Sequence, residues 1–251
     1  DFARQDRCNT SPGSSVPGMD FEPGSEVEGL LERVRAFMDE HIYPREAELH
    51  QAIDDEVKAG VAYPAALVEI REKAKAEGLG ITCSVTPYHL ALTDEALRGY
   101  SSAYKVMPPL RAESDRKALI AGLKDGTIDC IASHHAPHEW DAKAKEYEYS
   151  SDGMAIQELA YNIMWDTLKN SCSIDRLVTA MSLIPRDIFG LPERSITKGS
   201  EASLTLFTTS GTTTLQAEKK KSMGVNNPFL GKTLQGSVIG ILNNNKLHIN
   251  N

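Results

Sequence analysis

The densest group of residues able to do chemistry lies in the segment Ser133–His138, directly after the apolar run 128–133. It contains His134, His135 and His138, three of the seven histidines in the chain. Imidazole nitrogens bind zinc-type metals and exchange protons near neutral pH, and barrel enzymes keep their sites at the carboxyl ends of strands. The segment is therefore a candidate catalytic or metal site. A polar loop with ordinary hydrogen bonds remains the alternative, because a complete hydrolase site needs ligands from several strands.

His89 is a second candidate, since it also follows a short apolar run. A lone histidine between Tyr88 and Leu90 is more often a packed side chain with satisfied hydrogen bonds than a metal ligand. We therefore expect His89 to have a structural role.

The segment 105–111 carries two cations and a Pro-Pro pair. Lys105 and Arg111 could face an anionic substrate, with Arg111 as a bidentate clamp on a carboxylate. An equally good interpretation is a rigid turn that enters a helix capped near Ser114. The basic run Lys219–Lys221 is expected to be a solvated loop.

The composition excludes several classes of protein. The chain has 251 residues, with 27 Lys and Arg against 35 Asp and Glu, which gives a formal charge of −8. An acidic surface argues against binding to nucleic acid or to anionic membranes, so a small-molecule substrate is expected. Because the sequence has neither a long apolar span nor the pattern of a signal peptide, we expect a cytoplasmic protein. The four cysteines lie far apart in the sequence and form no C-x-x-C pair, so we expect reduced thiols rather than a disulfide scaffold or a structural zinc site.

The elements that must position these residues fall into distinct segments. Residues 1–18 are rich in Ser, Pro, Gly and charge, which is typical of a disordered leader. Apolar residues then recur at helical spacing, so residues 19–79 are expected to be an all-helical segment, with helices from Ser25, over 45–58 and over 64–79.

The pattern changes after Gly80. Short apolar runs at 81–86 and 128–133 alternate with helical patterns near 113–124, 153–169 and 174–182. This alternation predicts an α/β fold with a parallel sheet or barrel over residues 80–200. Apolar runs at 203–207, 237–242 and 246–250 predict a small antiparallel β unit over residues 201–251.

Several segments resemble the C-terminal half of a dihydroorotase, a member of the amidohydrolase superfamily. They are ITCSVTPYHLALTDEAL (81–97), YKVMPPLR (104–111), GLKDGTIDCIASHHAPHEWD (122–141), IPRDIFGLPE (184–193) and NNPFLGKTLQGSVIG (226–240). The resemblance implies a partial (β/α) barrel of amidohydrolase type, with a small C-terminal β extension.

The resemblance also implies a function, which is the reversible hydrolysis of dihydroorotate to carbamoyl aspartate in pyrimidine biosynthesis, assisted by one or two zinc ions. His134 stands where the family has its catalytic and metal-binding Asp, so it becomes the expected catalytic residue and metal ligand. His138 matches the histidine that binds the substrate carboxylate. Arg111 and Met107 match substrate-binding positions, and Met107 replaces a common Asn.

The family's remaining metal ligands belong to an N-terminal half that these segments do not match, and no H-x-H pair occurs in the 251 residues. Activity of this chain is therefore expected to be impaired. The alternative is an inactive homologue that acts as a structural partner of aspartate carbamoyltransferase. An incomplete barrel has exposed sheet edges, so we also expect association, for instance as a homo-oligomer.

Residues 19–79 resemble the N-terminal helices of an acyl-CoA dehydrogenase, through MDFEPGSEVEGLLERVRAFMDEHIYPREAEL (19–49) and YPAALVEIREKAKAEGLG (63–80). This resemblance implies a chimeric chain joined near residues 70–80. It also gives a further alternative, a fragment of a flavin-dependent dehydrogenase.

Overall fold

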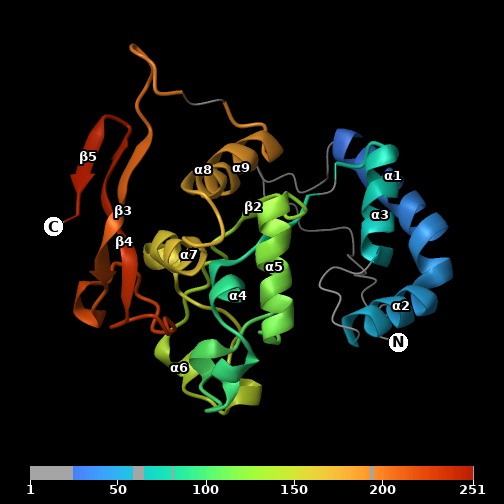
Figure 1. Cartoon of the computed structure of the whole chain (residues 1–251), viewed down its shortest axis with the longest axis horizontal. Helices are drawn as coiled ribbons and strands as arrows, with labels where there is room; N and C mark the ends of the chain where they lie inside the picture. The colour runs from blue at the N-terminus through green and yellow to red at the C-terminus, as the bar shows by residue number, and fades with distance from the viewer. Residues whose placement is uncertain (1–24, 59–64, 81, 193–194, 251) are drawn as a thin grey trace, which may run out of the picture. The chain divides into compact units, whose positions relative to one another are not determined.

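The computed structural model describes residues 25–58, 65–80, 82–192 and 195–250 (Figure 1). The chain divides into two compact units, residues 1–49 and residues 50–251. The predicted boundary near residue 80 therefore falls inside the second unit. The leader predicted over residues 1–18 lies outside the described residues.

The described part of the first unit is helical. Helix α1 spans Ser25–Phe37 and continues into a π-helical turn (Met38–Ile42), a 3₁₀ turn (Tyr43–Arg45) and the start of α2 (Glu46–Lys58). The apolar spacing that predicts α1 does not bury all its members, because Val27, Leu30, Leu31 and Val34 remain between 37% and 49% exposed.

Helix α3 (Ala65–Ala76) belongs to the second unit. Two residues after its end lies Gly78, whose φ of 68° allows the Leu79 N–H to donate to the Ala74 carbonyl at 2.8 Å. This is a Schellman ending, and the chain leaves it toward the first strand. The Arg71 guanidinium lies 3.5 Å from the carboxylate of Asp129, which connects α3 to the start of the second strand.

The α/β part contains a short parallel pair. Strand β1 (Ser84–Val85) lies beside β2 (Cys130–Ile131), with Ser84 opposite Cys130. Both strands are shorter than the apolar runs predict. Pairing of β1 stops where Pro87, which has no backbone N–H, begins α4 (Pro87–Ala91), and β2 is followed by a left-handed residue, His134.

Helix α5 (Glu113–Asp125) follows β1 and precedes β2 in the sequence, close to its predicted range of 113–124, but its N-cap differs from the prediction. The predicted cap near Ser114 is wrong, because Ala112 is the N-cap residue and the Asp115 carboxylate accepts its N–H at 3.1 Å. The carboxylate is preferred here because it also opposes the positive end of the helix dipole.

The helix predicted over 153–169 begins later than expected. Residues 157–159 form a 3₁₀ turn and α7 spans Ala160–Leu168, whereas Met154 bridges His135 in parallel and remains buried. Pairing with the histidine segment therefore replaces the first helical turn. The next helical stretch is longer than predicted and comprises α8 (Ile174–Val178), a π-helical turn (Thr179–Leu183) and α9 (Ile184–Ile188).

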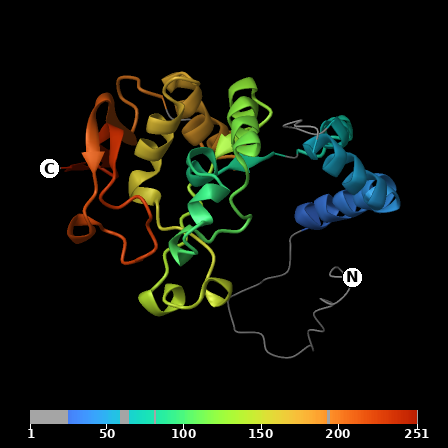
Figure 2. The same cartoon turned by 60° about the horizontal axis from the view of Figure 1, so that its bottom comes forward.

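The C-terminal strands form one antiparallel sheet in the order β3-β4-β5, with bounds Leu204–Thr214, Thr233–Asn243 and Lys246–Ile249. Helix α7 lies along this sheet in both cartoon views (Figure 2). Three side chains of α7, those of Tyr161, Asn162 and Trp165, donate to strand carbonyls, which fixes the helix against the sheet.

The remaining short helical elements are Asp94–Leu97, Ser102–Tyr104, α6 (Trp140–Lys143), Tyr147–Tyr149 and Ala217–Lys219. None of the described helices combines the length and apolar character needed to cross a membrane. Cys83, Cys130 and Cys172 are free thiols, as expected, while Cys8 lies outside the described residues.

Candidate functional site

The carboxyl ends of β1 and β2 lie at the same edge because the strands are parallel. His134 follows β2 and is exposed, with a φ of 46°. Tyr88 follows β1 in α4 and is fully buried. The Tyr88 hydroxyl lies 2.6 Å from Nδ1 of His134, so this hydrogen bond joins the two strand ends and orients the imidazole ring.

His89 is a packed structural residue, as predicted. Its Nε2 lies 2.9 Å from the Pro108 carbonyl, which can only accept, so Nε2 carries a proton. Its Nδ1 lies 2.7 Å from the Thr86 hydroxyl, which can then donate to it. Burial lowers the pKa of His89 below its ordinary value of 6.5, and the neighbouring His134 lowers it further. The neutral ring therefore ties α4 to the loop that contains Pro108.

His138 is held at two points. Its backbone N–H donates to Oδ1 of Asn226 at 2.9 Å, and its ring Nε2 lies 2.7 Å from the Asp152 carbonyl. Since a carbonyl only accepts, Nε2 must carry the proton, and Nδ1 is left as the second functional atom of the ring. A neutral ring offers a lone pair at Nδ1, whereas a protonated ring donates from Nδ1 to an anion.

Asn226 connects three segments of this site, and sequence reasoning assigned it no role. Its side chain is almost fully buried, and its Nδ2 donates to the carbonyls of Ala136 at 2.7 Å and Gly153 at 2.9 Å. The amide thus joins the histidine loop to residue 153 and to its own segment. Asn226 stands in the turn-like stretch Asn226-Asn227-Pro228, and Asn is common in turns, so the sequence carries no signal that separates Asn226 from a surface residue.

Two glycines allow these segments to approach closely. A Cβ on Gly153, whose φ is 127°, would lie 2.5 Å from the Cβ of Ala136, and a Cβ on Gly224 would lie 2.7 Å from the Cβ of Pro137. The histidine loop is therefore packed on both sides against backbone that only glycine can supply without rearrangement.

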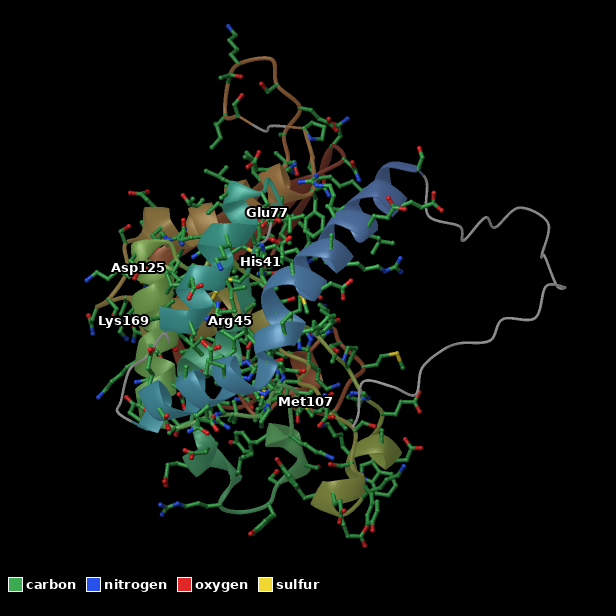
Figure 3. All side chains as sticks on the ribbon, turned by 90° about the vertical axis from the view of Figure 1, so that its right-hand side faces the viewer. His41, Arg45, Glu77, Met107, Asp125 and Lys169 are labelled. Atoms are coloured by element: carbon green, nitrogen blue, oxygen red, sulfur yellow. The ribbon has the colours of Figure 1, made fainter. Side chains whose placement is uncertain are left out.

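Arg111 and Met107 lie on the loop between the two histidine segments. The Arg111 side chain is 64% exposed, with its Nε 3.8 Å from the Asp115 carboxylate, and Met107 is 62% exposed and precedes a cis peptide bond (Figure 3). The loop is tied to His89 through the Pro108 carbonyl and to residue 153 by a bond from the Gly153 N–H to the Lys105 carbonyl. Among the contacts of the described residues, none joins Arg111 or Met107 directly to His134 or His138.

The expected zinc does not fit the side chains that the structure describes. Within residues 25–58, 65–80, 82–192 and 195–250, no group of three or more His, Cys, Asp or Glu is placed to hold a metal ion. A zinc site in a hydrolase requires three protein ligands with a fourth position open. His134 could supply one ligand through Nε2, because its Nδ1 bonds Tyr88. The described residues thus do not form a metal centre, and the role of His134 as a ligand stays a prediction.

A cleft of about 670 Å³ lies apart from these residues, between the helices of the α7–α9 region and the C-terminal sheet. Its lining includes Tyr161, Met164, Leu177, Met181, Phe207 and Ile241. This cleft is lined by none of the predicted site residues, which are His134, His138, Arg111 and Met107.

Comparison with known sequences gives a consistent group of relatives, although no family model matches the chain. The chain is 38% identical over 196 residues to a dihydroorotase of Elusimicrobium minutum, covering 77% of this chain and 45% of the relative. It is 41% identical over 173 residues to the dihydroorotase of Caldanaerobacter subterraneus (68% and 40%), and 34% identical over 208 residues to that of Pelotomaculum thermopropionicum (82% and 49%).

Solved structures with a similar fold are named as hydantoinases, as a dihydropyrimidinase and as an inactive dihydroorotase-like domain. The L-hydantoinase of Arthrobacter aurescens has a TM-score of 0.66 at 23% identity, covering 88% of this chain and 54% of its own. The dihydropyrimidinase of Brevibacillus agri has a TM-score of 0.64 at 24% identity, covering 91% and 55%. The inactive dihydroorotase-like domain of a Chaetomium thermophilum CAD-like protein has a TM-score of 0.51 at 20% identity, covering 72% and 47%. At such identities these likenesses show the fold alone, an α/β fold that the chain shares with these proteins.

The comparisons do not show the predicted resemblance of residues 19–79 to an acyl-CoA dehydrogenase. A dihydroorotase match that covers 82% of the chain must extend upstream of residue 80, because residues 80–251 number only 172. The chain is thus similar to dihydroorotases over more than two thirds of its own length, and it spans less than half of the length of these relatives.

Proposed function

We propose that this chain carries the substrate-binding part of a dihydroorotase-like amidohydrolase, which interconverts dihydroorotate and carbamoyl aspartate in pyrimidine biosynthesis. The observation that carries the proposal is the similarity to curated dihydroorotases at 34–41% identity. A match that covers 68% or more of 251 residues includes residues 134–138 wherever it begins. The histidine loop therefore belongs to the similar region.

The architecture proposed for the second unit is part of a (β/α) barrel. The parallel pair β1 and β2, with α4 and α5 on the connection between them, supports this, as do TM-scores of 0.66 and 0.64 to hydantoinase-type enzymes. The barrel part covers residues 80–200, and the C-terminal β extension covers residues 201–251. Helix α3 is an additional element of this part, because Arg71 pairs with Asp129 beside β2.

Substrate binding is assigned to His138 and the loop that carries Arg111. Dihydroorotate and carbamoyl aspartate both carry carboxylates, which a protonated imidazole or a guanidinium binds by charge-assisted hydrogen bonds. The contact of Nε2 with the Asp152 carbonyl supports this role, because it leaves Nδ1 of His138 for the ligand. The high exposure of Arg111 leaves its guanidinium free to turn toward a carboxylate. Met107, on the same loop, would contact the substrate through its apolar side chain.

Catalysis by the chain alone is proposed to be impaired. His134 lies at the strand end where the chemistry of the family is expected, but the described residues supply too few neighbouring ligands for zinc. The missing ligands would have to come from another polypeptide or from residues that the structure does not describe.

The test combines binding, turnover and metal content on the full chain. We expect dihydroorotate and carbamoyl aspartate to bind in isothermal titration calorimetry, with no detectable interconversion and with zinc below about 0.1 ion per chain by elemental analysis. His138→Ala should weaken binding about tenfold or more, which is about 1.4 kcal/mol. The exposed His248 provides a matched control, and His248→Ala should leave binding unchanged.

Two results would overturn parts of this proposal. If neither compound binds, the assignment of the substrate is wrong. Interconversion by a preparation that holds one zinc ion per chain would show that the chain is a complete enzyme.

A second candidate function is an inactive homologue that supports aspartate carbamoyltransferase. The lack of a three-ligand metal group among the described residues favours it. A domain named inactive and dihydroorotase-like, from a CAD-like multifunctional protein, has a related fold. Co-elution of the chain with aspartate carbamoyltransferase, without binding of dihydroorotate, would support this candidate over the first.

A further inference from the structure

We infer that Lys143 is a positioning residue for His138, because its ammonium fixes the loop whose Asp152 carbonyl selects the protonated nitrogen of the His138 ring. The consequence for substrate binding rests on the proposed function, whereas the fixing of the ring does not.

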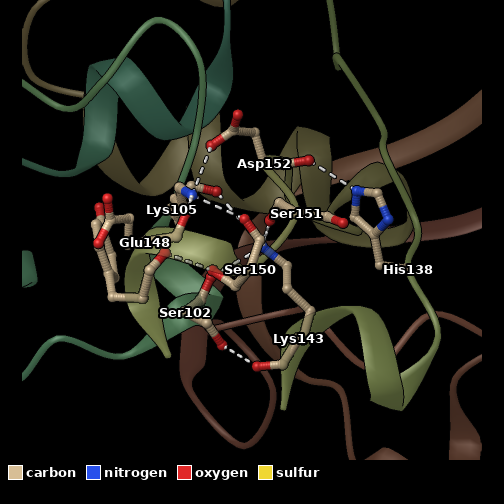
Figure 4. Close-up of polar contacts among 9 residues, drawn as sticks. Ser102, Lys105, His138, Lys143, Glu148, Ser150, Ser151 and Asp152 are labelled. Atoms are coloured by element: carbon tan, nitrogen blue, oxygen red, sulfur yellow. Dashed lines mark hydrogen bonds and ion pairs between the residues drawn. The ribbon is translucent and has the colours of Figure 1, made fainter. Parts of the chain in front are cut away.

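Lys143 is a buried cation that contacts only backbone acceptors in its hydrogen bonds. The residue is 8% exposed at the end of α6, and its Nζ donates to the carbonyls of Ser151 at 2.6 Å, Ser102 at 2.9 Å and Lys105 at 3.5 Å (Figure 4). The Ser102 hydroxyl donates in return to the Lys143 carbonyl at 2.6 Å. An ammonium has three donors, so the three carbonyls use all of them.

Burying an ammonium group costs free energy, because the group loses its contacts with water. Burial lowers the pKa of Lys143, although the Asp152 carboxylate opposes that shift. A lysine that only covers apolar surface would extend its charged end into water. Here the charged end is instead directed into the protein, toward the segment that precedes Asp152.

A second cation holds the same segment from its more exposed side. Nζ of Lys105 donates to the carbonyls of Glu148 and Ser150, both at 2.8 Å, and lies 4.0 Å from the Asp152 carboxylate. Successive carbonyls of Ser150 and Ser151 thus bind two different ammonium groups. The peptide planes on either side of Ser151 are thus fixed. The next plane, which carries the Asp152 carbonyl, is held by the Gly153 N–H, which donates at 2.9 Å to the Lys105 carbonyl that Nζ of Lys143 also contacts.

The Asp152 carbonyl meets Nε2 of His138 at 2.7 Å (Figure 4). It stabilises the ring only when Nε2 is protonated, since two acceptors repel each other. The neutral ring is therefore held in one tautomer, with its lone pair at Nδ1. Once Nδ1 is protonated, it is the atom that we assign to the substrate carboxylate. Without Lys143, the segment can turn the Asp152 carbonyl away, and the ring loses both its orientation and its tautomer preference.

The test reads the His138 ring directly by ¹⁵N NMR at a pH where the ring is neutral. In the unaltered chain we expect a protonated Nε2 and an unprotonated Nδ1, with the signals assigned by their loss in His138→Gln. Lys143→Met, which keeps the aliphatic length but removes the ammonium, should shift these signals toward a mixture of tautomers. Lys145→Met removes an exposed lysine two residues away and should leave them unchanged.

If Lys143→Met fails to fold, Lys105→Met tests the inference instead, because it removes only the contacts of Lys105 with the loop. We expect a partial shift toward the tautomer mixture in that variant. An unaltered His138 signal in every folded variant of Lys143 and Lys105 would overturn the inference. The NMR result needs no ligand, so a failure to bind dihydroorotate would refute the proposed function while leaving this test intact.

The same variants give a binding readout where dihydroorotate does bind. Lys143→Met should weaken its affinity about tenfold, which is about 1.4 kcal/mol, and Lys145→Met should not change it. Unchanged affinity in a Lys143→Met variant whose tautomer has shifted would overturn the link between the ring and the substrate.

Discussion

At the scale of single residues, the site depends on polar side chains that are buried rather than on those facing solvent. Asn226 binds three backbone groups, two in the histidine loop and one at Gly153, and Lys143 binds three carbonyls. A buried polar group that loses its partners costs more free energy than the hydrogen bond itself contributed. These two residues should therefore be the most sensitive positions around His138.

Replacing Asn226 by Asp tests this directly. The substitution keeps the acceptor for the His138 N–H but points a second oxygen at the carbonyls of Ala136 and Gly153. We expect the free energy of unfolding to fall by about 2–4 kcal/mol, from two lost hydrogen bonds and the unsatisfied groups left behind. Urea denaturation measures it. Asn170→Asp, at an exposed position, should change stability by less than about 0.5 kcal/mol, and equal effects would contradict the role of Asn226.

The lowered pKa of His89 predicts a pH dependence of stability. Below pH 6.5 the unfolded chain binds a proton at His89 while the folded chain does not, so the free energy of unfolding falls as the pH falls. The fall ends once the folded ring is also protonated. His89→Gln should reduce the slope measured by urea denaturation between pH 7.5 and pH 5. His248→Gln, at an exposed residue, is the control, and an unchanged slope in His89→Gln would refute the prediction.

The sequence pattern singles out the histidines as candidates, whereas it gives no sign of the buried polar residues. His134 and His138 stand out because three histidines follow an apolar run, and the packed state of His89 follows from its apolar neighbours. Asn226 and Lys143 have no such pattern, since their partners are backbone carbonyls up to 90 residues away. Only the folded chain brings those carbonyls to them.

At the scale of elements, hydrogen bonds between distant segments decide whether a segment with a helical sequence pattern becomes a helix. Residues 153–156 have a helical pattern, but the Ala136 N–H donates to the Met154 carbonyl and the Ala155 N–H donates to the Asn226 carbonyl. Those bonds extend the segment between the histidine loop and the C-terminal region. Helix α5 and the C-terminal strands, whose patterns meet no such competition, lie close to their predicted positions.

The close packing of this extended segment predicts an asymmetry between two glycines. Gly153 and Gly126 both have positive φ, but a Cβ on Gly153 meets Ala136 at 2.5 Å, whereas one on Gly126 meets nothing within 4 Å. Both alanine variants carry backbone strain, and only Gly153→Ala adds overlap. It should therefore be less stable than Gly126→Ala by about 1–3 kcal/mol. Thermal or urea unfolding compares the two variants. Equal losses of stability would show that the histidine loop can shift to accommodate the added Cβ at little cost in free energy.

At the scale of the whole molecule, the parallel sheet is small. In the described residues, the parallel sheet has only β1 and β2, so each strand has one edge without a strand partner. Such edges can pair with another chain, as can exposed apolar side chains on a sheet. The sequence resemblance predicts this, since it covers the second half of the family's barrel and not the first.

We therefore expect the chain to associate, and the C-terminal sheet offers a way to reduce it. Ile239 and Ile241, two residues apart on β4, are 45% and 47% exposed and lie on one face because strand side chains alternate. Light scattering after gel filtration should give a mass above that of one chain, rising with concentration. The double variant Ile239→Lys/Ile241→Lys should lower that mass, because two buried charges would oppose association at this face. Thr212→Lys adds a charge to neighbouring β3 and should have little effect. A compact, stable monomer at every concentration would refute the expectation. It would mean that other parts of the same chain cover the unpaired edges of β1 and β2.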